Sequence, residues 1–262
     1  MKNLLLPCFF LLLLVTSCKK NVPTQTDHVF VSNDIKNMVN YLEKTTGFDQ
    51  SKISYDNSKK LFTIDKDILI EELEVKEYIS QDKKQSKSSK ISHYRGTYLL
   101  NNDVVSRIYY EVKPYTGVPG VDNSWKDAVT QAFRNWNNTN SKVKFIMYYG
   151  QKGAWPNLRF YSNNNGNNDI VASAYLPASS GMIGGGVQIN TYYNFMSFDE
   201  KVFAITHELG HTLGLLHTDQ VEGSFINGTP VTDPNSVMNS FVLPWAGFTN
   251  GDLTAINILY PN

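Results

Sequence analysis

Three of the five histidines in this 262-residue chain lie within eleven consecutive positions, in the segment HELGHTLGLLHTD (207–219). His207 and His211 are four residues apart, so an α-helix would place both imidazoles on one face, one turn from each other. Gly214 can end that helix in a left-handed conformation that other residues resist, and the chain can then bring His217 back. Three neutral imidazole nitrogens suit Zn²⁺ and leave a fourth tetrahedral position open. The spacing therefore predicts one catalytic zinc ion.

Glu208 adjoins the first histidine but lies off the face that would bind the metal. A carboxylate in this position can take the proton of a water molecule that the zinc activates and pass it to a leaving amine. This chemistry is hydrolysis of an amide bond, with Glu208 as the general base and without a covalent intermediate. The alternative is a helix end that carries histidines by chance, but histidine is scarce elsewhere in the chain.

The helix that would present this motif has a start signal upstream. Ser197 and Glu200 have the S-x-x-E form of a capping box. A second helix is predicted at 124–137, where apolar residues share one face. Strands are predicted at 104–112, 143–149, 158–161, 170–177 and 186–190. This order of elements indicates an α/β (α+β) domain over residues 94–262.

Shorter elements precede that domain. A helix is predicted at 34–44, capped by Asn33 and ended by Gly47, with an apolar face of Ile35, Met38, Val39 and Leu42. The apolar runs 61–64 and 68–73 are interpreted as a strand and a second small helix. Residues 33–80 are thus predicted to form a small N-terminal module, and the lysine- and serine-rich residues 81–93 a linker.

The first residues have the form of a secretion signal, with Lys2 followed by an apolar run at 4–15. The run ends in Val-Thr-Ser-Cys, which resembles the lipobox of bacterial lipoproteins. We therefore expect a signal peptide at 1–17, a lipid anchor on Cys18 and a tether at 18–32. A plain signal peptide with an incidental cysteine is the alternative. The expected location is the bacterial cell envelope, in the outer membrane or at the cell surface, or outside the cell after release.

Composition excludes other classes of protein and of site. The chain has 24 lysines and arginines against 24 aspartates and glutamates, and this balance gives no reason to expect a nucleic-acid partner. Its two cysteines, Cys8 and Cys18, both lie in the first 20 residues. A disulfide framework, a catalytic thiol and a cysteine metal ligand are therefore excluded from the rest of the chain. Nothing in the sequence indicates the oligomeric state.

The signature His207-Glu208-x-x-His211-x-x-Gly214-x-x-His217 resembles the zinc-binding motif of the metzincin metallopeptidases. Met238, in SVMNS, matches the Met-turn of that clan, which forms an apolar floor beneath the metal. Residues 172–190 resemble the edge strand and glycine-rich loop of matrixin-like members, and residues 248–261 resemble their C-terminal helix. The similarity is closest to bacterial lipoprotein and secreted peptidases of the M57 type. Their signature is often written HEIGH, whereas this chain has Leu209.

The resemblance implies a metzincin-like catalytic domain with a twisted mixed sheet, an active-site helix and a C-terminal helix. Thr249 would cap the last helix, with a mostly buried face of Leu253, Ile256, Ile258 and Leu259. The edge strand would pair with a protein or peptide substrate in extended conformation. The segment after Met238 would supply part of the pocket for an apolar residue that follows the scissile bond, through Phe241, Val242, Leu243 and Trp245.

Some features depart from the clan. Ser240 stands where certain members have a tyrosine that contacts zinc, so no such ligand is expected. An oxygen-rich loop leaves two interpretations open, a calcium site or an asparagine-rich turn, and it comprises Asn164, Asn168 and Asp169. Because no cysteine remains to block the metal, an inhibitory N-terminal module would need another ligand, and Asp65 or Asp67 is the candidate.

Two other functions compete with a zinc endopeptidase. The first is a zinc-containing surface binding or adhesion module without proteolytic activity. Glu208 and the open coordination position argue against it, because structural zinc is more often closed by a fourth protein ligand. The second is hydrolysis of a non-peptide amide, which an edge strand suited to extended chains disfavours. His28 and His93 are isolated and are interpreted as surface or structural residues.

Overall fold

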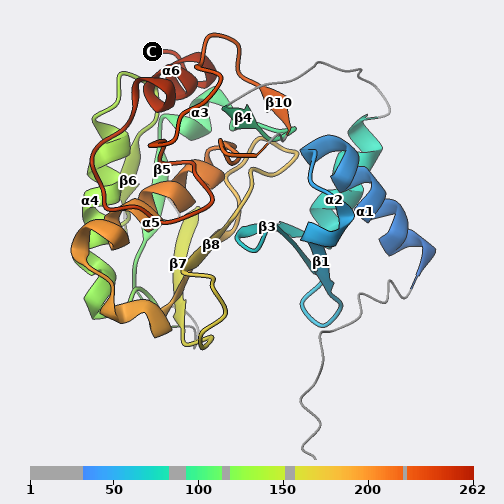
Figure 1. Ribbon diagram of the computed structural model, residues 1–262, viewed down its shortest axis with the longest axis horizontal. Coiled ribbons are helices and arrows are strands. Elements are labelled where there is room, and N and C mark those ends of the chain that lie inside the picture. Colours follow the sequence, from blue (N-terminus) through green and yellow to red (C-terminus); the bar gives the residue numbers. More distant parts are fainter. Residues whose placement is uncertain (1–31, 83–92, 114–118, 151–156, 221–222) are drawn as a thin grey trace, which may run out of the picture.

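The computed structural model describes residues 32–82, 93–113, 119–150, 157–220 and 223–262 (Figure 1). The predicted signal peptide, Cys8 and Cys18 lie outside these residues, as do His28, most of the tether and most of the lysine- and serine-rich linker. Within the described ranges, no helix is both long enough and apolar enough to cross a bilayer.

The strands of the described residues form two sheets. Their bounds are β1 Ile53–Asp56, β2 Leu61–Ile64, β3 Ile68–Glu71, β4 Tyr94–Arg95, β5 Ile108–Glu111, β6 Phe145–Met147, β7 Leu158–Asn163, β8 Ala172–Tyr175, β9 Gly186–Asn190 and β10 Ser224–Phe225. An eight-stranded mixed sheet has the order β1-β2-β3-β8-β9-β7-β5-β6, and β4 pairs with β10 separately. β8 is antiparallel to β9 and parallel to β3. The strands β6, β5, β7 and β9 pair in parallel.

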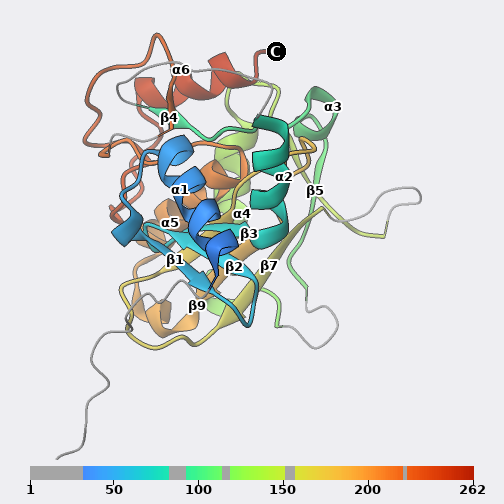
Figure 2. The ribbon, with the colours of Figure 1, turned by 90° about the vertical axis from the view of Figure 1, so that its right-hand side faces the viewer.

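Helices flank the large sheet. Their bounds are α1 Asn33–Thr46, α2 Glu72–Asp82, α3 Asn102–Val105, α4 Lys126–Asn137, α5 Phe198–Thr212 and α6 Asn250–Leu259, with short 3-10 turns η1 Gln50–Lys52, η2 Asn123–Trp125 and η3 Thr191–Phe195. α1 and α2 lie side by side next to β1–β3 (Figure 2). At the other end of the sheet α4 packs on α5, and α5 also contacts β8 and β9 (Figure 1). This arrangement confirms the mixed α/β class, with the motif on a central helix.

Local capping chemistry fixes most helix ends. α5 begins with the predicted capping box at Ser197, and α6 begins at the predicted cap Thr249, which also forms a complete capping box. α1 ends at Gly47 in a left-handed conformation, but its cap is Ser32 and not Asn33. The Ser32 side chain accepts a hydrogen bond from the backbone of Ile35, which satisfies one of the free N–H groups of the first turn.

Three sequence-based expectations were wrong. The segment 104–112 begins as the end of helix α3, because Asn101 caps a turn that buries Val104 and Val105, and only then becomes β5. The run 68–73 is strand β3 followed by the start of α2, since a short apolar run does not distinguish a strand from a helix. Ile258 is exposed on α6.

Two hydrophobic clusters lie along the sheet. The larger is built from residues between positions 100 and 260, around Trp125, Trp136 and Met238. The smaller joins α1, α2 and β1–β3, and it includes Tyr94, Leu176 and Leu216 from the other half. The N-terminal segment is thus packed onto the rest of the protein, and the sheet continues from one to the other. The division at residues 81–93 stays a prediction.

Candidate metal centre

Helix α5 carries the first two histidines into the interior, where residues 201–212 are all buried. Gly210 allows the sulfur of Met238 to lie directly against the helix, because a Cβ at this position would collide with it. Gly214 follows with φ +90°, and its carbonyl accepts a hydrogen bond from the backbone of Gly96 at 2.8 Å. The chain therefore turns sharply after α5, as the motif predicted.

The turn brings the three imidazoles together. Ring centroids are 4.6 Å apart for His207 and His211, 5.2 Å for His207 and His217, and 4.9 Å for His211 and His217. Nδ1 of His207 lies 2.8 Å from the Val237 carbonyl oxygen. Nδ1 of His211 lies 2.8 Å from the Leu215 carbonyl oxygen. Because a carbonyl only accepts, each Nδ1 donates the hydrogen bond, and in a neutral ring of this tautomer Nε2 is the nitrogen that has a lone pair for a metal.

The donor set fits a zinc ion. Nε2 of His211 is buried and has no hydrogen-bond partner among the described residues. Burial, with His207 and His217 close by, holds the pKa of His211 well below its usual value, so the ring stays neutral. A neutral, buried nitrogen without a partner is costly unless a ligand satisfies it. Three histidines whose nitrogens converge with Asp67, with no thiolate among them, are the ligand chemistry of a catalytic zinc site.

Glu208 lies beside this group, and its Oε2 atom is buried without a hydrogen-bond partner among the described residues. Burial raises the pKa of Glu208 well above its ordinary value, and the charge of Asp67 adds to this effect, while His217 opposes it. A carboxyl group with a raised pKa is suited to accept and return a proton near neutral pH. The side chain also lines a cavity of about 350 Å³.

A fourth side chain reaches the histidines from the N-terminal part of the chain. Oδ2 of Asp67 lies 3.3 Å from Nε2 of His217 and 3.7 Å from Nε2 of His207. Ligand atoms of Asp67 and all three histidines lie within 4.8 Å of one another. Burial alone would raise the pKa of Asp67, but the nearby His217 and His207 hold it well below its ordinary value. Asp67 is one of the two aspartates that were predicted to reach the metal, and it is thus the fourth potential ligand of this group.

The turn between β2 and β3 directs this carboxylate inward. Asp65 and Lys66 both have positive φ, +45° and +81°, a conformation that costs energy in residues other than glycine and that only surrounding contacts maintain. Asp65 supplies such contacts: its carboxylate lies 3.3 Å from Nδ1 of His217 and 3.1 Å from Lys52, and it accepts a hydrogen bond from Gln220. The turn is therefore anchored on both sides of the metal centre.

Strand β8, predicted as the free edge for substrate, is covered in this structure. The backbone N–H of Ala174 donates to the carbonyl of Asp67 at 2.9 Å, and that of Leu176 donates to the carbonyl of Leu69 at 3.2 Å. β3 is thus hydrogen-bonded along β8, directly after the aspartate that reaches the histidines. The expectation of an unpaired edge was wrong because it ignored a strand from the N-terminal module.

The cavity next to Glu208 has apolar walls formed by Tyr193, Phe203, Phe241 and Val242. The β2–β3 turn, residues 65–67, forms another part of its lining. Two other residues proposed for this pocket are absent from its lining. Leu243 and Trp245 instead pack against the larger hydrophobic cluster.

The segment around Met238 lies beneath the histidines and is fully buried at the methionine. The backbone N–H of Thr218, next to the third histidine, donates to the Met238 carbonyl at 2.9 Å, and Thr218 Oγ1 donates to Asn239 at 2.8 Å. Ser240 bonds through both its N–H and its hydroxyl to the carboxylate of Asp219. Asp219 therefore fastens the residues after Met238 to those after His217.

The asparagine-rich loop has its polar atoms engaged. The side-chain amide of Asn190 donates to the carbonyls of Gly166 and Ile170 and to Oδ1 of Asn168. Oδ1 of Asn164 accepts from the backbone of Gly166. These bonds favour the turn interpretation over a calcium site.

Sequence reasoning missed a group of residues that contacts the segment around Met238, namely His93, Ser236 and Asp252. His93 was interpreted as isolated, yet it is 1% exposed and lies against Asp252. The T-x-x-D spacing of Thr249 and Asp252 signals a helix start, but it gives no sign that the same carboxylate also reaches the segment before Met238.

Comparison with known proteins gives a family match. The sequence model of peptidase family M57, described as "Dual-action HEIGH metallo-peptidase", matches residues 62–224, from β2 through the third histidine to β10. No curated protein sequence matches the chain. Among solved structures, one match is the "Crystal structure of myroilysin", with a TM-score of 0.42 and 14% identity, covering 64% of this chain and 87% of that one.

Proposed function

The chain belongs to the M57 family of HEIGH metallopeptidases, and on this basis we propose that it is a zinc-dependent endopeptidase in which Glu208 is the general base. The observation that carries the proposal is the pairing of two features at one cavity. Three histidines turn their ring nitrogens toward one point, and a buried carboxyl group without a hydrogen-bond partner among the described residues stands beside them.

His207, His211 and His217 would hold the ion, each as a neutral imidazole. Bound there, zinc would supply Lewis acidity toward a substrate carbonyl and toward water. Glu208 would take the proton from the attacking water and deliver it to the leaving nitrogen. Its raised pKa makes the carboxylate a stronger base for the first of these two transfers. Met238 would keep the floor of the site apolar.

An extended protein or peptide is the substrate that this site favours. The amides of Ala174 and Leu176 on β8 already donate to a strand, β3, and a substrate strand could accept from the same two groups once β3 has left. The apolar walls of the cavity favour an apolar residue after the scissile bond.

The described arrangement corresponds to a latent form of such an enzyme. Asp67 occupies the side of the histidines that faces the cavity, and β3 occupies the strand position on β8. The N-terminal module is also held by the smaller hydrophobic cluster, which includes Leu176 and Leu216. Cleaving the linker alone would therefore leave the module packed in place, and activity requires that the β2–β3 turn be displaced.

The test combines metal analysis with cleavage. Full-length protein should contain one zinc per chain and cut little, and limited proteolysis that degrades the β2–β3 turn should release activity on a peptide library. A chelator should abolish that activity, and zinc should restore it. Zinc binding without any cleavage after removal of the turn would favour a binding or adhesion module instead.

We also propose that Cys18 carries a lipid that anchors the protein in a bacterial envelope. The support is the Val-Thr-Ser-Cys sequence after an apolar run. Mass spectrometry of the purified protein should find an acylated N-terminal cysteine, and Cys18→Ser should move the protein to the soluble fraction. An unmodified mature N-terminus elsewhere would contradict the proposal.

A further inference from the structure

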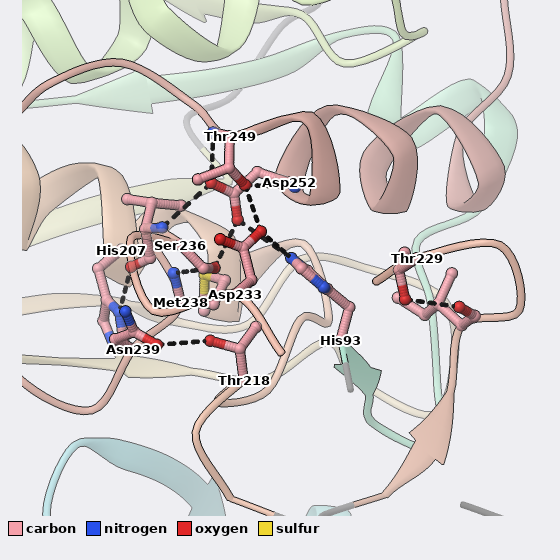
Figure 3. Close-up of polar contacts among 12 residues, drawn as sticks. His93, His207, Thr218, Thr229, Asp233, Ser236, Met238, Asn239, Thr249 and Asp252 are labelled. Carbon is pink, nitrogen blue, oxygen red and sulfur yellow. Dashed lines mark hydrogen bonds and ion pairs between the residues drawn. The ribbon is translucent and has the colours of Figure 1, made fainter. Parts of the chain in front are cut away.

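A second histidine lies between two carboxylates, away from the metal centre (Figure 3). Nε2 of His93 is 3.3 Å from Oδ1 of Asp252 and 3.7 Å from Oδ2 of Asp233. His93 and Asp252 are buried, and His93 has a positive φ of +52°. A non-glycine residue keeps such a conformation only where its surroundings impose it. These surroundings place the ring against the two aspartates.

Asp252 accepts hydrogen bonds from the segment that precedes Met238. Its Oδ1 accepts from Ser236 Oγ at 2.6 Å, and its Oδ2 accepts from the backbone N–H of Val237 at 3.1 Å. Oδ2 also accepts from the backbone of Thr249 at 3.0 Å, which completes the capping box of α6. One carboxylate therefore joins the start of α6 to residues 236–237.

The segment 236–238 in turn touches the metal centre. The carbonyl of Val237 is the acceptor for Nδ1 of His207 at 2.8 Å, and Ser236 Oγ accepts from the N–H of Met238 at 3.0 Å. Figure 3 shows this succession of contacts from His93 through Asp252 and Ser236 to His207. The orientation of the His207 ring depends on the Val237 carbonyl, because that bond fixes which ring nitrogen is left to face the metal.

We propose that Asp252, braced by His93, is a positioning residue for the metal ligand His207. It holds the peptide of residues 236–237 at the place where the Val237 carbonyl receives the Nδ1 proton of His207. This inference rests on the proposed zinc site, and it needs only metal binding there, whatever the substrate.

The same contacts argue against a second metal ion at His93. Both oxygens of Asp252 already accept hydrogen bonds from Ser236, Val237 and Thr249, and Asp233 accepts one from the hydroxyl of Thr249. Carboxylates engaged in this way have little capacity left for a cation. The group therefore braces a neighbouring loop and is not itself a binding site.

Zinc affinity of the full-length chain, measured by competition with a chromogenic chelator, tests the proposal. Asp252→Asn keeps the size of the side chain but loses one acceptor oxygen, and His93→Gln removes the brace. Both should weaken zinc binding by roughly 10- to 100-fold, as expected when a partner of a metal-binding histidine is lost. Ser236→Ala should have a smaller effect in the same direction, and it guards against a variant that does not fold.

The matched control is Tyr260→Phe. Tyr260 is also buried at the end of α6, and its hydroxyl donates to the Leu213 carbonyl at 2.6 Å, a contact that does not involve the Met238 segment. This variant should lower the melting temperature of the metal-free chain without changing zinc affinity. The visible absorption spectrum of the Co²⁺-loaded chain gives a second readout, because it reports ligand geometry, and it should change in Asp252→Asn and His93→Gln but not in Tyr260→Phe.

Native zinc affinity and an unchanged cobalt spectrum in Asp252→Asn, His93→Gln and Ser236→Ala would overturn the proposal and leave the group a purely structural one. The proposed function fails in a different way, through a native chain that binds zinc but cuts no peptide after the turn is removed. A native chain that binds no zinc would overturn both.

Discussion

Nε2 of His217 lies 3.3 Å from Oδ2 of Asp67, and Nε2 of His93 lies 3.3 Å from Oδ1 of Asp252, but the surroundings of the two pairs differ. Beside His217, Asp67 comes from the N-terminal module, one of its oxygens is buried without a hydrogen-bond partner among the described residues, and the group borders a cavity. Beside His93, Asp252 comes from the C-terminal helix, and both of its oxygens accept hydrogen bonds. The two groups differ in their carboxylates, because Asp67 retains an unsatisfied oxygen whereas both oxygens of Asp252 are engaged, although Nδ1 of His93 is also buried without a hydrogen-bond partner among the described residues.

This difference distinguishes a candidate metal-binding site from a group of residues that supports a loop. Buried polar atoms without partners are costly, so a fold keeps them where a ligand or a reaction satisfies them. A carboxylate that is saturated by backbone N–H groups instead fixes the position of a loop. Proximity of histidine and aspartate is therefore not sufficient to assign a metal site, and the hydrogen bonds of the carboxylate decide the assignment.

The largest expected effect is at Glu208, which belongs to the first group only. Glu208→Gln should lower the cleavage rate of the activated enzyme by roughly 10²- to 10⁴-fold, because the proposed general base is lost. Zinc content should stay at one per chain, since Glu208 is not a ligand. Glu200→Gln, in the exposed cap of the same helix, is the control and should retain most of the activity. Peptide cleavage rates with metal analysis measure both, and near-native activity in Glu208→Gln would contradict the assignment.

The number of zinc ions bound per chain tests directly whether only the first group binds metal. His211→Ala should remove the bound zinc, whereas Asp233→Asn, in the second group, should leave one zinc per chain. Native mass spectrometry of the full-length variants distinguishes these outcomes. Two zinc ions in the native chain, with one lost in Asp233→Asn, would mean that the His93 group binds metal after all.

Asp67→Ala tests the unsatisfied carboxylate of the first group. Losing an interaction between a charged group and the metal centre should raise the activity of the full-length chain by about tenfold or more, since such interactions contribute about 1.5–3 kcal/mol. The gain should stay well below that of removing the turn, because β3 still covers β8. Asp56→Ala, at the end of β1 and with its carboxylate bonded to Ser58, is the matched control. A peptide-cleavage assay without prior proteolysis measures the effect, and equal activity in the native chain and Asp67→Ala would count against latency through this residue.

The smallest effect is expected at Ser240, which follows Met238 by two positions and belongs to neither group. Ser240→Ala removes the hydroxyl contact to Asp219 and keeps the backbone one. The free energy of unfolding should fall by about 1 kcal/mol or less, with zinc content and cleavage rate unchanged. Urea denaturation measures the first quantity. A marked loss of zinc would instead place this position among the residues that support the metal.

The sequence was sufficient for features set by neighbouring residues. The four-residue spacing of His207 and His211, the capping box at Ser197 and the N-cap at Thr249 depend on contacts within one helical turn, and the structure has them where they were predicted. The left-handed turn at Gly214 could likewise be predicted from the sequence, because it involves only the backbone conformation of that residue. The hypothesis that Asp65 or Asp67 reaches the metal rested on the absence of a usable cysteine, and it did not choose between them.

The sequence by itself therefore determined which residues can bind the metal and which helix presents them. Tertiary structure alone decided that Asp67 enters the centre, that β3 covers β8, and that His93 braces Asp252 across 159 positions of the chain. The physical reason is how far apart in the sequence the contacting residues lie. Helix periodicity and capping are fixed by residues three or four positions apart, whereas these contacts arise only when strands pair and hydrophobic clusters pack elements that are distant in sequence.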